Sequence, residues 1–489
     1  MCHGGRWTML QNSLSIKRRS FLRAMASAAA GLFVPAGARP QTGVARLVVD
    51  YEGPGRLVAA DFVGLSYESA ILADGDYFTP DNGSLLGLIR TLGDNGVIRI
   101  GGNTSERTVW QVEPRPPPAD SFVVTPASVD RLAAVLRVLG WQLIYGLNLA
   151  RSSPEEAAEE AAYVARAVGR NLLAFQIGNE PDGFGRWTGV RRKTYDAAAF
   201  LAEWRTFHAA IRSRVHAAHF AGPDVAAATD WVGALAAQQP QGLVLLTRHY
   251  YADGPAGAPH VGLAKLLQSG GQIAPVLEEL ARSSQTFHLP YRLAETNSVY
   301  NEGQPGVSDT LGAALWGTEL MFRVAAAGAG GVNFHGGVHN FRPDDDKAYT
   351  PIARGGSGRY RATPLYYGIL LFAQAARGEL VTARLAAQRD DLKAFAVRAQ
   401  DGTLRVCLIN LNLQHGARVR IDPGRGFAAA SVMRLAGPAA DATAGVMLGQ
   451  ASVDEFGGWM PVTDEVQRDG REVVVDVSAT SAALLSLRT

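Results

Sequence analysis

The stretch Leu173-Ala174-Phe175-Gln176-Ile177, which continues as Gly178-Asn179-Glu180-Pro181, decides the fold. Its first five residues form a short, mostly apolar run that is typical of a buried strand. The preceding segment, Pro154–Val168, is rich in alanine and begins with proline and two glutamates, as helices often do. The sequence therefore predicts a helix that leads into a buried strand, with a glutamate directly after that strand.

The same alternation extends in both directions along the chain. Further strands are expected at Phe62–Tyr67, Val97–Ile100, Gln142–Leu147, Ala218–Ala221, Val244–Tyr250, Tyr291–Ala294 and Gly331–Phe334. Further helices are expected at Ser128–Leu139, Ala197–Ala217, Ile273–Arg282 and Asp309–Ala327. Strands that alternate with helices in this way favour a (β/α)8 TIM barrel of the α/β class over residues 58–377. A doubly wound sheet is the alternative, but no glycine-rich dinucleotide loop follows the first strand.

The pattern changes after residue 377. Residues 378–489 contain short, often alternating runs punctuated by glycine, aspartate and asparagine, which predict an antiparallel β-sandwich domain. Strands are expected there at Leu392–Val397, Leu404–Leu411, Ala417–Ile421, Ala430–Leu435 and Val473–Val477. Residues 39–57 contain one more strand-like run, Arg46–Tyr51, which we expect to join the sandwich.

The amino terminus has the features of an export signal. Residues 1–38 contain basic residues and no acidic residue, and the run Lys17-Arg18-Arg19-Ser20-Phe21-Leu22-Arg23 resembles the twin-arginine motif. A short apolar stretch and the small-residue site Ala36-Gly37-Ala38 follow. An amphipathic helix is the alternative, but it does not explain the order of these features. We therefore expect a periplasmic or extracellular protein without a membrane anchor after signal cleavage.

The composition excludes several classes of function. The 489 residues include 47 basic and 45 acidic residues, so the net charge of +2 does not indicate a nucleic-acid partner. Two cysteines, Cys2 and Cys407, are too few for a disulfide scaffold or a cysteine-rich zinc module. The histidines are dispersed and no His-Glu-x-x-His motif occurs. We expect no metal and no other cofactor.

Two glutamates stand at positions where barrel enzymes carry their chemistry. Glu180 follows the fourth expected strand and Glu295 follows the seventh, and in a closed barrel both strand ends open on one face. Paired carboxyl groups cleave glycosidic bonds when one is protonated and the other is ionised. In a retaining enzyme the ionised group attacks the sugar. The alternative is that Glu180 caps a turn and Glu295 forms an ion pair.

Several motifs resemble one family of glycosidases. Asn179-Glu180-Pro181 after strand four, with a second glutamate after strand seven, is similar to the large clan of retaining (β/α)8 glycoside hydrolases, clan A. Gly64–Glu68, Ile98–Asn103 and Glu295–Tyr300 resemble the β-glucuronidase and heparanase family within it, glycoside hydrolase family 79. The resemblance implies that Glu180 is the acid/base and Glu295 the nucleophile.

The same resemblance implies roles for other residues. Asn179 is expected to bind the sugar 2-hydroxyl, and Arg99 is expected to support the nucleophile through a hydrogen bond. Tyr250 is the expected hydrogen-bond partner of Glu295, with Tyr251 as the alternative. The remaining substrate-binding residues expected at the barrel mouth are Glu68, Asn103, Tyr300, Asn301, Gly303, His335 and Gly337.

The sequence thus predicts a retaining, exo-acting β-glucuronidase whose partner is a glucuronic-acid-containing oligosaccharide or glycoconjugate. An endo-acting heparanase-like enzyme is one alternative, but it needs basic subsites, which we do not expect in the predicted loops. Another clan A β-glycosidase, such as a xylosidase or arabinofuranosidase, is a second alternative. A non-catalytic carbohydrate-binding protein is the third, although such a protein needs no acid–nucleophile pair.

Overall fold

The computed structural model describes residues 43–339, 342–355, 358–387 and 389–488. The expected export signal, residues 1–38, lies outside the described residues. No helix within the described part of the chain is long and apolar enough to cross a membrane.

A closed barrel of eight parallel strands forms the first region, as the sequence predicts. All eight expected strands are present, and most of their ends lie within two residues of the expected ones. In chain order the barrel strands are β3 (Val63–Glu68), β4 (Val97–Gly101), β7 (Gln142–Leu147), β8 (Leu172–Ile177), β9 (Phe220–Val225), β10 (Leu243–Asp253), β11 (Tyr291–Val299) and β12 (Val332–Gly336).

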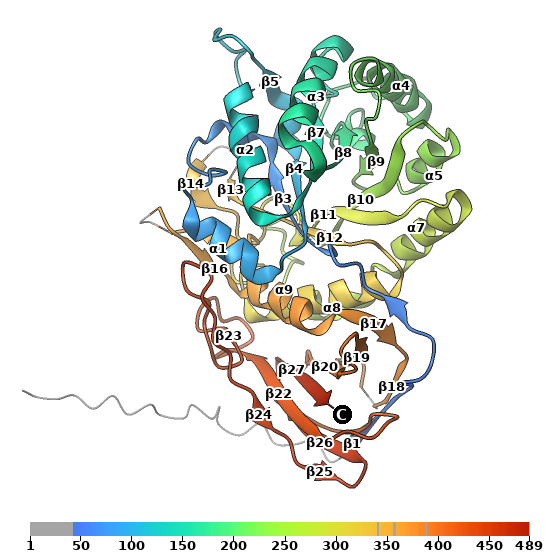
Figure 1. Ribbon diagram of the computed structural model, residues 1–489, viewed down its shortest axis with the longest axis vertical. Coiled ribbons are helices and arrows are strands. Elements are labelled where there is room, and N and C mark those ends of the chain that lie inside the picture. The colour runs from blue at the N-terminus through green and yellow to red at the C-terminus, as the bar shows by residue number, and fades with distance from the viewer. Residues whose placement is uncertain (1–42, 340–341, 356–357, 388, 489) are drawn as a thin grey trace, which may run out of the picture. The chain divides into compact units, whose positions relative to one another are not determined.

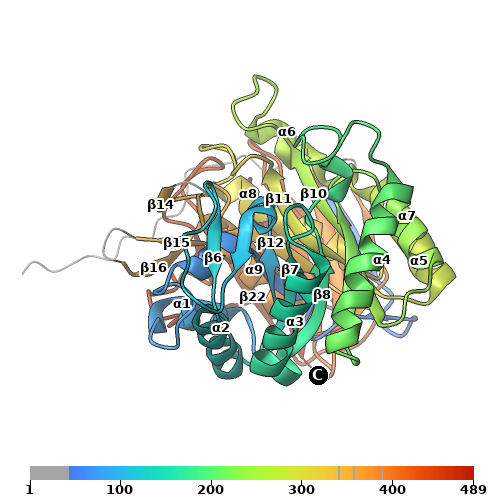
Figure 2. The ribbon, with the colours of Figure 1, turned by 90° about the horizontal axis from the view of Figure 1, so that it is seen from above.

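Helices follow each barrel strand and pack around the outside, where α2, α3 and α4 lie side by side (Figure 2). Local sequence sets where they begin. The Ser153 hydroxyl accepts a hydrogen bond from the Glu156 backbone N–H, and the Glu156 carboxylate accepts one from the Ser153 backbone N–H, so α3 begins with a capping box. The helices are α1 (Gly83–Leu92), α2 (Pro126–Leu139), α3 (Pro154–Val168), α4 (Ala197–Arg214), α5 (Asp230–Ala237), α6 (Leu263–Gln268), α7 (Ala274–Phe287), α8 (Leu311–Ala326) and α9 (Pro364–Ala375).

The second region is a two-sheet β-sandwich. One sheet has the order β18-β1-β21-β26-β25, and the other has the order β2-β17-β19-β20-β27-β22-β23, with β24 beside β22. The bounds are β1 (Val44–Val49), β2 (Arg56–Leu57), β17 (Gly378–Val381), β18 (Ala383–Ala386), β19 (Leu392–Ala399), β20 (Leu404–Asn410), β21 (Ala417–Asp422), β22 (Ala429–Ala436), β23 (Met447–Leu448), β24 (Asp464–Glu465), β25 (Arg468–Asp469), β26 (Glu472–Val477) and β27 (Ser481–Arg488). One pair departs from the antiparallel prediction, because β1 runs parallel to β21.

Strand β20 connects the two hydrophobic cores. Val406 and Leu408 face the core between the two sheets, whereas Cys407 and Ile409 belong to the core around the barrel helices. Successive side chains of a strand point to opposite faces, so one strand serves both cores. Helices α8 and α9 lie between the barrel strands and this sheet (Figure 1).

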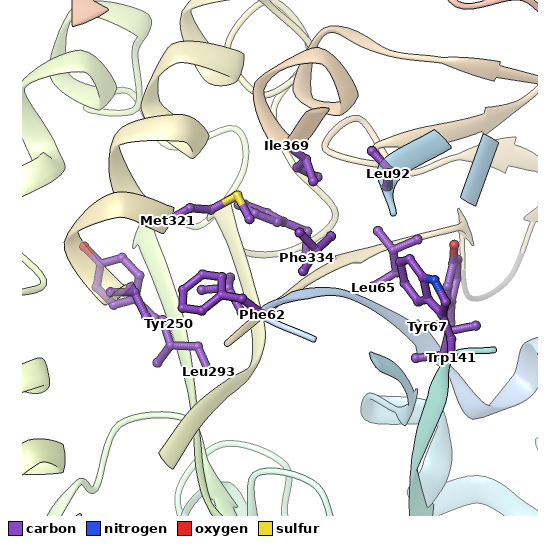
Figure 3. Packing of buried hydrophobic residues seen from close by; sticks show 14 of the residues in the cluster. Phe62, Leu65, Tyr67, Leu92, Trp141, Tyr250, Leu293, Met321, Phe334 and Ile369 are labelled. Carbon is purple, nitrogen blue, oxygen red and sulfur yellow. The ribbon is translucent and has the colours of Figure 1, made fainter. Parts of the chain in front are cut away.

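Small two-stranded sheets complete the structure. They pair β5 (Thr108–Trp110) with β6 (Phe122–Val124), β13 (Val338–His339) with β14 (Arg342–Asp346), and β15 (Ile352–Arg354) with β16 (Tyr360–Ala362). Figure 3 shows the apolar layer outside the barrel strands, where Phe62, Leu293 and Phe334 pack near Met321 of α8.

Candidate active site

The two predicted glutamates meet at the carboxyl ends of the barrel strands. Glu180 follows β8, as predicted, and its backbone is in the left-handed region with φ of 47°. Glu295 does not follow its strand as expected, because β11 continues to Val299. The pairing of β11 with β10 shifts by one residue before Glu295, and such a bulge re-aims a side chain. One oxygen of each carboxyl group lies within 4.8 Å of the other and of a nitrogen of His249.

Glu295 is surrounded by hydrogen-bond donors. The Arg99 guanidinium donates from Nη1 to Oε2 at 2.6 Å, and the Tyr251 hydroxyl donates to Oε1 at 2.7 Å. Burial raises the pKa of Glu295, but His335, His249 and Arg99 together hold it well below its usual range. Burial lowers the pKa of His335 itself, whereas His249, whose pKa is raised to about 10, and the Arg99 guanidinium both carry charge beside Glu295 near neutral pH. The Glu295 carboxyl group is therefore ionised.

Arg99 joins several strands of the barrel. It is 1% exposed and donates further hydrogen bonds to Asp224, to Asn179 Oδ1 at 2.8 Å, to Gln176 Oε1 at 3.1 Å and to Ser66 Oγ at 3.2 Å. The expected bond between Arg99 and the second glutamate is present. The ion pair with Asp224 was not foreseen, although an aspartate buried in an apolar strand region is a recognisable signal.

Glu180 has a different environment. His249 Nδ1 lies 2.9 Å from Glu180 Oε1, and His249 Nε2 lies 3.0 Å from Asp224 Oδ1. Burial raises the pKa of Glu180 above its usual value; the His249 contact opposes this rise and the charge of Glu295 adds to it. The two glutamates therefore have pKa shifts of opposite direction within one site, which is the condition for an acid and an ionised partner.

Glu180, His249 and Glu295 form the one cluster in the described residues whose ligand atoms are spaced closely enough for a metal ion. The protonation state of His249 does not suit a metal ligand. Burial lowers the pKa of His249, but Asp224 and Glu295 raise it to about 10, so both ring nitrogens carry protons and face carboxylates. A metal ligand requires a neutral imidazole with a free lone pair.

Glu68 lies in a second buried cluster beside the glutamates. Thr104 donates to Glu68 Oε2 from its backbone at 2.9 Å and from its hydroxyl at 2.8 Å. On the other oxygen, Oε1, Lys347 Nζ donates at 3.0 Å, and His335 Nε2 lies at 3.3 Å. Ser66 Oγ contacts the other ring nitrogen of His335 at 2.9 Å. Lys347, which is 2% exposed, was missed because it lies in a loop without periodic pattern.

Asn179 and Asn103, both expected among the substrate-binding residues, lie side by side. Asn179 Nδ2 donates to Asn103 Oδ1 at 3.3 Å, and Asn103 is exposed. The Asn179 backbone donates to Glu106 Oε1 at 2.7 Å, and the Ala150 backbone donates to Glu106 Oε2 at 2.8 Å. Glu106 thus ties together the loops after β7 and β8, a role that sequence reasoning missed.

The structure does not bring Tyr250 to Glu295. Side chains alternate along β10, so Thr247, His249 and Tyr251 share the inner face. Tyr250 points outward into the apolar layer near α8 (Figure 3). The preference for Tyr250 was therefore wrong, and the alternative, Tyr251, is the hydrogen-bond partner of Glu295.

The loop after β11 rises beside this site. Asn301, Glu302 and Gly303 have φ of 63°, 69° and 81°, three successive residues in the left-handed region. A Cβ on Gly303 would lie 2.7 Å from the Tyr349 backbone nitrogen, so the loop and Tyr349 pack closely. The charge of Glu302 contributes to the raised pKa of Tyr349, whose largest cause is burial. Tyr300 is 42% exposed.

Gly337 was expected to bind substrate, but in the structure it shapes a turn. Its backbone N–H donates to the Thr350 hydroxyl at 2.8 Å, and its φ of 84° favours glycine. A Cβ there would lie 3.1 Å from the Tyr67 ring. Its amide is therefore engaged within the protein, and the residue shapes the turn after β12.

The chain has sequence relatives among curated β-glucuronidases. It is 27% identical to a β-glucuronidase of Aspergillus niger over an alignment of 397 residues that covers 72% of this chain and 71% of the relative. The expected resemblance to the β-glucuronidase and heparanase family is confirmed. A β-glucuronidase of Neurospora crassa is 25% identical over an alignment of 389 residues that covers 70% of this chain and 68% of that protein. No protein-family model matches the chain.

Solved structures confirm the barrel-and-sandwich fold. A 4-O-α-L-rhamnosyl-β-D-glucuronidase from Fusarium oxysporum superposes with a TM-score of 0.77 at 19% identity, covering 90% of this chain and 100% of its own. A family 51 arabinofuranosidase from Xanthomonas axonopodis superposes with a TM-score of 0.66 at 18% identity, covering 91% of this chain and 100% of its own.

Proposed function

We propose that this chain is a retaining, exo-acting β-glucuronidase that removes terminal β-linked glucuronic acid from glycans or glycoconjugates. One observation carries the mechanism: two carboxyl groups with oxygens within 4.8 Å have pKa values shifted in opposite directions. Retaining glycosidases place their carboxyl groups about 5–5.5 Å apart, whereas inverting enzymes leave room for a water molecule between them. The curated relatives named β-glucuronidase support the choice of substrate.

In the first step, Glu295 attacks the anomeric carbon while Glu180 donates its proton to the leaving oxygen. The C–O bond to the leaving group breaks, and a bond from the sugar to Glu295 forms. Arg99 and Tyr251, each on a different carboxylate oxygen, hold Glu295 ionised and oriented for this attack.

In the second step, Glu180 acts as a base. Formation of the sugar ester removes the negative charge of Glu295, which had raised the pKa of Glu180. Glu180 then takes a proton from water, the oxygen of that water attacks the anomeric carbon, and Glu295 leaves as a carboxylate. His249 stays hydrogen-bonded to Glu180 and keeps the carboxyl group in place through both steps.

Other residues around the two glutamates would hold the sugar. Asn179, oriented by Arg99, is placed to bind the 2-hydroxyl, and Asn103 extends the same polar edge. Glu68, held by Lys347 and Thr104, presents a carboxylate to outer hydroxyl groups. The backbone of residues 301–303 is the candidate for binding the uronate carboxylate, because successive left-handed residues turn backbone amides toward one side.

A panel of aryl β-glycosides tests this proposal with the purified mature protein. The aryl β-glucuronide should be cleaved with retention, and Glu295→Gln should abolish cleavage. Glu180→Ala should keep part of the first step on an activated aryl substrate, and added azide should restore turnover by replacing water. Equal or better turnover of the β-glucoside or β-xyloside contradicts the uronate specificity, and absence of azide rescue contradicts the role of Glu180.

We also propose export through the twin-arginine route, with cleavage near residue 38. The basic residues, the apolar stretch and the small-residue site in residues 1–38 support it. Replacing both Arg18 and Arg19 by lysine should retain the protein inside the cell, as cell fractionation would measure. Export of that variant at the parent level contradicts this route.

A further inference from the structure

The loop between Glu180 and α4 is firmly folded against the barrel. Backbone hydrogen bonds join Gly183 to Glu180 at 2.8 Å and Trp187 to Gly183 at 3.0 Å. Asp182 accepts three backbone N–H groups, from residues 226–228 after β9, each at 2.9 Å. Arg191 donates to the carbonyl groups of Leu149 and Ala150 at 3.0 Å each. The loop is therefore a fixed wall of the site on the side of Glu180.

The outer face of this loop is basic. Arg186, Arg192 and Lys193 are exposed, and no described residue forms an ion pair or side-chain hydrogen bond with any of them. Residues 183–195 contain no acidic residue. Arg151, on the neighbouring loop after β7, is also exposed. The expectation of no basic cluster in these loops was wrong, since the loop that follows Glu180 carries three exposed cations within eight residues.

An exposed tryptophan lies within the same loop. Trp187 is 53% exposed, whereas Trp141, Trp204, Trp231 and Trp316 are each at most 5% exposed. Its indole ring rests on Gly183, where a Cβ would lie 2.4 Å from the ring. An exposed indole ring held against a fixed backbone offers an apolar face on which a ligand ring can pack.

The position of the loop assigns the ligand. Glu180 protonates the leaving oxygen, so the sugar on its side of the scissile bond belongs to the leaving group. We propose that the basic loop, residues 183–193, binds the leaving-group sugar, with Trp187 against the ring and Arg186, Arg192 and Lys193 facing an anionic substituent. This inference rests on the proposed function and extends it: the substrate is a glucuronide whose next sugars carry sulfate or carboxylate groups. Side-chain cations that form no ion pair within the protein can bind sulfate or carboxylate groups without first breaking a protein contact.

Matched disaccharides test the proposal. One is glucuronic acid β1,3-linked to N-acetylgalactosamine, and the other carries a single 6-sulfate on the second sugar. We expect kcat/KM for the sulfated disaccharide to be about 5- to 10-fold higher at low salt, with the preference lost in 0.5 M salt because exposed charges are screened. The variant Arg186→Gln/Arg192→Gln/Lys193→Gln should hydrolyse both disaccharides equally.

Two controls make the result specific. Glucuronyl fluoride has no leaving-group sugar, so its hydrolysis reports an intact catalytic centre in every variant. A matched variant, Arg384→Gln/Arg471→Gln/Arg488→Gln, removes three exposed cations from the β-sandwich and should keep the preference for the sulfated disaccharide. Trp187→Ala should lower kcat/KM for both disaccharides about fivefold relative to the fluoride.

The outcomes separate this inference from the proposed function. If the parent enzyme hydrolyses the fluoride but shows no preference for the sulfated disaccharide, the anionic ligand is refuted. A preference that survives in the loop variant also refutes it. An unchanged ratio of disaccharide to fluoride hydrolysis in Trp187→Ala refutes the role of the ring. Failure of the parent to hydrolyse glucuronyl fluoride or the aryl glucuronide contradicts the proposed function itself.

Discussion

Replacing Tyr251 by phenylalanine removes one hydroxyl group from the site and leaves the ring in place. That hydroxyl donates to Glu295 Oε1 at 2.7 Å. After its loss, His249 Nδ1 remains 3.9 Å from this oxygen, while Arg99 still binds the other oxygen. The substitution therefore isolates one hydrogen bond to the carboxylate.

The expected loss of rate in Tyr251→Phe depends on the step in which Glu295 regains its negative charge. In the second step the sugar ester breaks and Glu295 regains its negative charge, so the Tyr251 hydrogen bond strengthens as the transition state forms. A hydrogen bond to a charged group contributes about 1.5–3 kcal/mol. Since about 1.4 kcal/mol corresponds to a tenfold rate change, the second step should slow roughly 10- to 150-fold.

Stopped-flow release of an activated aryl leaving group measures both steps. Tyr251→Phe should show a burst of aryl release followed by slow turnover, with KM lowered together with kcat because the ester accumulates. Tyr250→Phe is the matched control, since Tyr250 packs outside the barrel and its variant should retain kcat within about twofold. Equal losses in both variants, or an unchanged kcat in Tyr251→Phe, would refute this reasoning.

Three further predictions follow from the buried carboxyl groups. The pKa of Glu180 is raised and that of Glu295 is lowered, so kcat/KM should fall as pH rises through the pKa of Glu180 and also as pH falls through the pKa of Glu295. Glu180→Gln, assayed with an activated substrate, should lose the decrease at high pH. Burial raises the pKa of Glu160 to about 7, so its contribution to stability is present below about pH 4.3 and is lost as pH rises through 7. Urea denaturation should show that Glu160→Gln gains about 3 kcal/mol relative to the parent between pH 4 and pH 8, and a constant difference contradicts this. Glu106→Gln loses an acceptor for the Asn179 or Ala150 backbone and should lower kcat/KM for the aryl glucuronide about tenfold, whereas parent-level activity contradicts its positioning role.

The barrel was predictable because its strands are continuous apolar runs separated by helical segments. Buried parallel strands have this pattern, and helix caps such as Ser153 with Glu156 are visible in the sequence. Glu180 was also predictable in position, since a polar residue directly after a buried strand of a barrel lies at the mouth. The direction of β1 beside β21 was not predictable, because local pattern does not encode the orientation of a strand's partner.

The inner polar groups were harder to predict. Choosing between Tyr250 and Tyr251 requires knowing which of the two side chains points to the inside of the barrel. This depends on the register of the strands and on the bulge before Glu295. Lys347 and Glu106 act from segments without hydrophobic periodicity, so their partners depend on the paths of loops. Trp187 could be recognised as a candidate ligand contact only from its exposure in the structure, because the neighbouring sequence does not predict whether a tryptophan is buried.

The central claim is that Glu295 forms a covalent bond with the sugar. Incubation with 2-deoxy-2-fluoroglucuronyl fluoride should trap this ester, because the 2-fluoro group destabilises the transition states of both steps while fluoride still leaves. Mass spectrometry of peptic fragments should find one added fluoroglucuronyl group on the peptide that contains Glu295, and none in Glu295→Gln. A label on Glu180 or another residue, or full hydrolysis with inversion and no label, would contradict the account.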